Sequence, residues 1–122
     1  MYDIWKDLFE IVEKRKADHE EGSYTAYLFD AGLDKILKKL GEETAETIIA
    51  AKNLAGGIHA DGDANPDSER EALTNEAGDL LYHLVVMLNE LGVRPEEVEK
   101  VLRERMQKTG NLKKFHQTDK DS

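Results

Sequence analysis

The stretch LDKILKKLGEETAETIIAAKNL, residues 33–54, decides the fold that the sequence predicts. Side chains that suit a buried face recur in it every three, four or seven residues, which is the spacing along one face of an α-helix. The stripe consists of Leu33, Ile36, Leu37, Leu40, Thr44, Ile48 and Ala51. Gly56 and Gly57 follow after Ala55, and glycine commonly ends a helix. We therefore predict a long amphipathic helix over residues 33–54.

A second long helix is predicted over residues 69–91. Residues 56–68, rich in Gly, Asp and Asn, indicate an exposed loop before it, and Asp67 or Ser68 is expected to cap its start, with Glu71 reaching back in a capping box. Its stripe consists of Leu73, Ala77, Leu80, Leu84, Met87 and Leu91. The second half is apolar on most faces, so we expect it to be covered on several sides. Together the two helices predict a helical hairpin.

Shorter helical segments flank the hairpin on both sides. Residues 4–12 have helical periodicity after a possible cap at Asp3, and Ser23 is expected to cap a short helix over residues 24–30. Pro95 suits the first position of a helix over residues 95–106. No segment alternates as a strand would. The sequence therefore predicts an all-α protein, with one domain over residues 1–106 and a loosely ordered tail over residues 107–122.

The overall composition excludes several classes of partner. The chain has 122 residues, a formal net charge of −9 and no cysteine, which argues against a nucleic-acid surface, a disulfide framework and a thiolate metal site. No apolar run approaches the roughly 20 residues of a membrane span, and the start of the chain lacks a signal-peptide pattern. We expect a cytoplasmic protein with no membrane partner. Because a small chain with few aromatic residues builds a limited core, oligomerisation is also expected.

Acidic residues recur at matched positions on the two long helices. Glu42, Glu43 and Glu46 lie three or four residues apart on the first, and Glu76 and Asp79 lie three apart on the second. If the apolar stripes pack together, these carboxylates meet at the rim of the core. Mg²⁺, or Mn²⁺, would relieve their repulsion, since hard cations prefer oxygen ligands. The alternative is a solvated surface without function, because Glu readily fills exposed helix positions.

Three further residues lie along the same acidic lines. Lys39 could offer its charge to a phosphate or pair with a neighbouring glutamate, and Asn53 continues the line toward the end of the helix. His83 could contact phosphate or transfer a proton, although a single histidine on a helix face is more often structural.

Three stretches resemble the MazG-like all-α NTP pyrophosphohydrolases and, within that group, are most similar to the phosphoribosyl-ATP pyrophosphatases. They are SYTAYL at residues 23–28, KLGEETAET at residues 39–47 and LTNEAGDLLYHL at residues 73–84. The resemblance spans roughly residues 4–105. The loop over residues 56–68 is longer than is usual in the wider group, and the tail extends beyond the part that matches.

The resemblance implies an activity, a cofactor and an assembly. The activity is hydrolysis of phosphoribosyl-ATP to phosphoribosyl-AMP and pyrophosphate, the second step of histidine biosynthesis. The implied fold is a MazG-like helical hairpin that forms a homodimer with a four-helix-bundle core. Glu43, Glu46, Glu76 and Asp79 would bind Mg²⁺. Glu42 would hold a further metal ion or orient the attacking water, so that Glu42, Glu43 and Glu46 form the catalytic set.

Substrate contacts and rival functions complete the set of hypotheses. Lys39 and His83 are predicted to contact a phosphate or the leaving group, while Asn53, Ser23 or Thr25 would hold the ribose or the base. One rival is a house-cleaning MazG-like enzyme acting on noncanonical dNTPs. A second is a carboxylate-bridged di-iron bundle, which needs Glu-x-x-His pairs, whereas this chain has an acid and a histidine four residues apart. A third is a non-enzymatic helical dimerisation module.

Overall fold

A computed structural model describes residues 3–57 and 67–108, which contain five α-helices and no strand. In chain order the helices are α1 (Ile4–Asp18), α2 (Tyr24–Ala31), α3 (Leu33–Gly56), α4 (Ser68–Glu90) and α5 (Pro95–Gln107). The all-α prediction is therefore confirmed. Within the described residues no helix is both long enough and apolar enough to cross a lipid bilayer.

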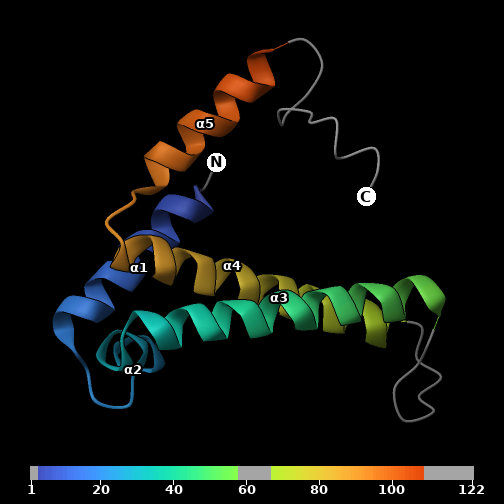
Figure 1. Ribbon diagram of the computed structural model, residues 1–122, viewed down its shortest axis with the longest axis horizontal. Coiled ribbons are helices and arrows are strands. Elements are labelled where there is room, and N and C mark those ends of the chain that lie inside the picture. Colours follow the sequence, from blue (N-terminus) through green and yellow to red (C-terminus); the bar gives the residue numbers. More distant parts are fainter. Residues whose placement is uncertain (1–2, 58–66, 109–122) are drawn as a thin grey trace.

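The hairpin of α3 and α4 is the central feature of the fold (Figure 1). The two helices lie side by side and antiparallel, within two residues of the bounds that the sequence predicts. The Thr47 hydroxyl lies 2.7 Å from the backbone oxygen of Glu43 and 3.3 Å from that of Glu76, so it joins the helices midway along the hairpin. Gly57 ends α3 in a left-handed conformation with φ 65°, which a glycine adopts without steric cost.

The hydrophobic core lies at one end of the hairpin, where α1 and α2 pack against it (Figure 1). Its buried side chains come from four helices and are Phe9, Val12, Leu28, Ile36, Val85 and Val86. The cover predicted for the second half of α4 is thus supplied by α1, α2 and the start of α3. Asp3 caps α1 by accepting a hydrogen bond from the backbone N–H of Lys6, at 3.1 Å.

Only part of the predicted stripe on α3 packs within the chain. Ile36 is fully buried, but Leu37 and Ile48 are 41% and 59% exposed. The face of α3 toward α4 instead runs through Ile36, Thr47 and the buried Ala50. A single neighbouring helix covers a narrow strip, so the rest of a broad apolar arc needs a second partner. Leu37 and Ile48, although part of the predicted stripe, therefore stay exposed instead of packing against α4.

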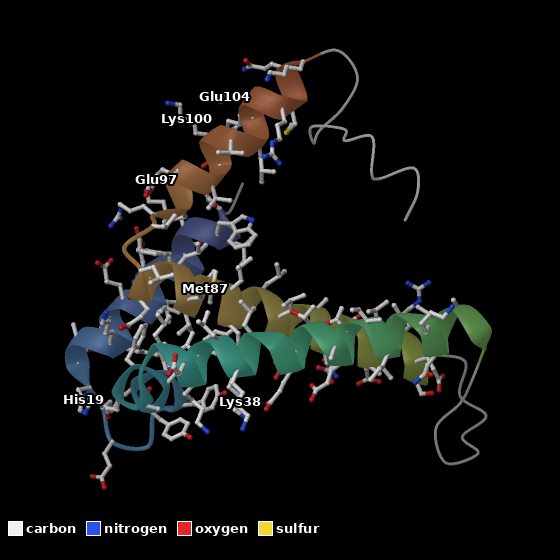
Figure 2. The ribbon with its side chains drawn as sticks, viewed as in Figure 1. His19, Lys38, Met87, Glu97, Lys100 and Glu104 are labelled. Atoms are coloured by element: carbon white, nitrogen blue, oxygen red, sulfur yellow. The ribbon has the colours of Figure 1, made fainter. Side chains whose placement is uncertain are left out.

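Helix α5 leaves the body of the molecule (Figure 1). Pro95 is its first residue, as predicted, and the backbone N–H of Arg94 donates to Glu97 Oε2 at 2.7 Å. Glu97, Lys100 and Glu104 lie on the side of α5 that points away from the hairpin (Figure 2). The helix ends one residue beyond the predicted limit. The tail over 109–122 and the loop over 58–66 lie outside the described residues, and the proposed domain boundary stays a prediction.

Candidate metal and active site

Three of the predicted carboxylates converge between the two long helices. Glu43, Glu46 and Glu76 each offer a ligand oxygen, and these oxygens all lie within 4.8 Å of one another. Glu43 and Glu46 lie three residues apart on α3, so their side chains leave the helix on neighbouring turns. Glu76 reaches the same point from α4, in the register that its backbone contact with Thr47 sets. We call these three residues the acidic cluster.

Two oxygens of the acidic cluster are buried without a hydrogen-bond partner among the described residues. They are Glu43 Oε2 and Glu76 Oε2. A buried carboxylate oxygen is costly unless it accepts a hydrogen bond, takes up a proton or binds a cation. The donor set consists of oxygen atoms alone, which suits a hard divalent cation better than a soft one. The acidic cluster therefore fits a Mg²⁺ or Mn²⁺ ion.

The acidic cluster also shifts the protonation of its own members. Desolvation, together with the carboxyl groups and negative charges of the neighbouring Glu46 and Glu43, raises the pKa of Glu76 to about 7. Loss of solvent likewise raises the pKa of Glu43, with added repulsion from Glu46 and Asp79. Like charges held together favour the protonated form, so a bound cation and a proton compete for this position.

Two predicted acids lie outside the acidic cluster. Asp79 is exposed on α4 and contributes no oxygen to the convergence, although its charge is close enough to act on Glu43. Glu42 instead forms an ion pair with Lys39 at 3.4 Å. The hydrogen bond from Lys39 to Glu42 and the negative charge of Glu42 raise the pKa of Lys39. Tyr24 contributes a smaller increase. The lysine is thus a stable cation one turn of α3 before Glu43.

The remaining predicted residues, Asn53, Ser23 and Thr25, do not belong to the acidic cluster. Asn53 is half-buried on α3, seven residues beyond Glu46, or about 10 Å along the helix axis. Ser23 acts as the N-cap of α2, where its hydroxyl accepts from the backbone N–H of Ala26 at 3.2 Å. Thr25 is buried and forms a hydrogen bond with the hydroxyl of Tyr82.

His83 is buried inside the protein and is not exposed to solvent beside the acidic cluster. Its Nδ1 lies 2.7 Å from the backbone oxygen of Asp79, and its Nε2 lies 2.9 Å from the hydroxyl of Tyr24. Both nitrogens are therefore engaged, which leaves none to ligate iron. The di-iron alternative has no histidine ligand at this position.

Sequence reasoning missed three residues that organise the site. Tyr24 and Tyr82 bond to His83 and Thr25, and Thr47 fixes the register of the two helices. The tyrosines lie inside the stretches that carry the resemblance. Their pairing could not be read from the sequence because 57 and 59 residues separate the partners.

The fold and the site together define a class: an all-α protein with a helical hairpin that brings three carboxylates together. The family model described as phosphoribosyl-ATP pyrophosphohydrolase matches residues 5–106. The chain belongs to this family of hydrolases, and the resemblance stated from the sequence is confirmed.

Several curated relatives share much of the chain. A phosphoribosyl-ATP pyrophosphatase of Streptococcus thermophilus is 51% identical over 98 residues, which cover 80% of this chain and 81% of the relative. One from Streptococcus sanguinis is 48% identical over 105 residues, covering 86% and 88%. The histidine biosynthesis bifunctional protein HisIE of Lactococcus lactis is 43% identical over 114 residues, which are 93% of this chain but 47% of that protein.

Proposed function

We propose that this chain hydrolyses phosphoribosyl-ATP to phosphoribosyl-AMP and pyrophosphate, the second step of histidine biosynthesis. The observation that carries the proposal is the acidic cluster, which lies within the segment that the family model matches. The names of the Streptococcus relatives give the substrate, and that of the bifunctional relative gives the pathway. Family membership favours this reading over a dimerisation module without activity.

The acidic cluster is proposed to bind Mg²⁺, with Mn²⁺ as a substitute. Neighbouring and opposite oxygens around an octahedral Mg²⁺ lie roughly 3 to 4 Å apart, and the oxygens of Glu43, Glu46 and Glu76 already lie within 4.8 Å. Small side-chain rotations would complete the set, and Asp79 could join through a water molecule. When bound, the ion would neutralise triphosphate charge and lower the pKa of a bound water.

The residues around the acidic cluster would position the reactants. Lys39, one turn of α3 before Glu43, would offer its positive charge to the substrate phosphates, and its pairing with Glu42 holds it along α3. Glu42 is then available, on rotation away from Lys39, to orient the water that attacks phosphorus. In-line displacement depends chiefly on such positioning and on charge neutralisation.

A homodimer is proposed because the hairpin has an uncovered apolar side. Leu37, Ile48 and, on α4, Leu81 are exposed. Ile48 lies two residues from Glu46, or about 200° around α3, so the apolar side faces away from the acidic line. Pairing with the same surface of a second hairpin would bury these side chains in a four-helix bundle.

We expect the purified protein to release pyrophosphate from phosphoribosyl-ATP in the presence of Mg²⁺ and to be inactive after chelation. Release is measured by a coupled pyrophosphate assay, with dCTP, dUTP and ATP as parallel substrates. Preference for dCTP or dUTP would contradict the proposal and favour a house-cleaning enzyme. Inactivity on all four substrates would contradict an enzymatic role at this site.

We expect Mg²⁺ to stabilise the protein more strongly as the pH rises. The pKa of Glu76 is about 7 in the folded protein, against an ordinary value of 4.5. The folded metal-free protein thus holds a proton that the unfolded chain has lost, so the stability that Glu76 contributes falls as the pH rises from 4.5 through 7. Mg²⁺ takes the place of that proton.

Differential scanning calorimetry should give a larger Mg²⁺-induced rise in Tm at about pH 8 than at about pH 5.5. Equal rises would show that Glu76 does not bind the ion.

A further inference from the structure

The partners of His83 fix the direction of its hydrogen bonds. Its Nδ1 contacts the backbone oxygen of Asp79 at 2.7 Å, and a carbonyl oxygen only accepts, so Nδ1 carries the proton and donates. In the neutral ring Nε2 is then an acceptor. The Tyr24 hydroxyl, 2.9 Å from Nε2, therefore donates to His83. The ring is 4% exposed, so its other contacts are made inside the protein.

This arrangement leaves Tyr24 able only to accept a hydrogen bond from a ligand. Its hydroxyl proton is donated in the hydrogen bond to His83, while its oxygen keeps a free lone pair that can accept another hydrogen bond. The residue is 45% exposed, so a ligand can reach it. A phosphate oxygen is itself an acceptor and cannot bond to this oxygen, whereas a sugar hydroxyl can donate to it.

Tyr24 lies near the candidate active site. The positive charge of Lys39 and the negative charge of Glu43 both act on its phenol group, so the phenol is close to both side chains. Its ring packs edge-on against that of His83, with centroids 5.8 Å apart and an interplanar angle of 76°. Helix α4, which also carries Glu76, thus fixes the position and the orientation of the Tyr24 side chain.

We propose that Tyr24 accepts a hydrogen bond from a hydroxyl of the adenosine ribose of the nucleotide, and that His83 is the positioning residue that sets this polarity. The assignment rests on the proposed hydrolysis of phosphoribosyl-ATP. It gives His83 a role different from the phosphate contact expected from the sequence, because the buried ring has both nitrogens engaged.

The first test is Tyr24→Phe, which removes the hydroxyl and keeps the ring. With saturating Mg²⁺, KM for phosphoribosyl-ATP should rise about 5- to 10-fold, the effect of one hydrogen bond, while kcat changes less than about twofold. Tyr27→Phe is the matched control, since Tyr27 stacks on Tyr24 and its hydroxyl makes no hydrogen bond to the described residues. Its KM should be unchanged.

The positioning role is tested by two substitutions of His83. His83→Leu should raise KM as much as Tyr24→Phe, and the double variant should be no worse than either single one, because both remove the same interaction. His83→Gln, which places an acceptor near the position of Nε2, should restore most of the lost affinity. This rescue separates positioning from packing even if His83→Leu folds poorly.

The ribose hydroxyl is tested by competitive inhibition with AMP, 2′-deoxy-AMP and 3′-deoxy-AMP. The wild type should bind one deoxy analogue about 5- to 10-fold more weakly than AMP, and Tyr24→Phe should abolish that difference. An unchanged KM in Tyr24→Phe, or unchanged discrimination among the three nucleotides, would overturn the inference while leaving the proposed hydrolysis intact. A wild type that does not hydrolyse phosphoribosyl-ATP would overturn the proposed function instead.

Discussion

Glu46→Gln is expected to reduce kcat/KM for phosphoribosyl-ATP by about 100-fold or more, since changes to groups that merely support metal ligands already cost 10- to 100-fold. The substitution keeps the size of the side chain but replaces one anionic oxygen of the acidic cluster with an amide. Of the acids that converge among the described residues, Glu43 and Glu76 would remain. The Mg²⁺-induced rise in Tm should fall in parallel.

The same variant should be at least as stable as the wild type without Mg²⁺. The charge of Glu46 contributes to the raised pKa of Glu76, so its removal relieves repulsion in the metal-free protein. Glu10→Gln, an exposed glutamate on α1, is the control for loss of a negative charge and should keep wild-type activity. A wild-type value of kcat/KM in the Glu46→Gln variant would show that Glu46 does not belong to the active site.

Ile48→Asp is expected to dissociate the proposed dimer into monomers. Ile48 is 59% exposed at the middle of the uncovered side of the hairpin. A carboxylate buried there would cost about 2 kcal/mol or more in each copy. A two-fold symmetric interface doubles this cost, so the dissociation constant should rise about 1000-fold. Analytical ultracentrifugation across protein concentrations measures the change.

The control for Ile48→Asp is Ile11→Asp, which introduces the same charge at an exposed isoleucine of α1. It should leave the oligomeric state unchanged. Far-UV circular dichroism should show that both variants keep their helices, because neither side chain belongs to the buried core. A wild type that is monomeric at every concentration, or an Ile48→Asp variant that still dimerises, would contradict the proposed surface.

Much of the fold follows from local signals in the sequence. The periodic stretches of α3 and α4, Ser23 as an N-cap and Pro95 as a first helical residue all lie where they were predicted. These signals act within one or two helical turns, so a single sequence contains them completely. The acidic residues at spacings of three and four also follow from helix geometry alone.

Tertiary structure decided how these local elements meet. Glu43, Glu46 and Glu76 converge while Asp79 and Glu42 stay outside, because side-chain packing sets the rotation of α3 against α4, and this rotation also brings Thr47 to the backbone of Glu76. Such rotation depends on interlocking side chains of both helices, which periodicity leaves undetermined.

Burial of polar groups was likewise a tertiary outcome. His83 could be placed on a helix face from sequence, but its burial and its bond to Tyr24 depend on where α2 docks. The sequence by itself determined the helices, the N-caps of α1 and α2 and the acidic spacing, because these arise from contacts between near neighbours in the chain. The capping box predicted for α4 is wrong, since the side chain of its N-cap residue Asp67 makes no capping hydrogen bond. Only the tertiary structure decided which acids share one point and which aromatic groups contact His83 and Thr25, because those contacts join residues far apart in sequence.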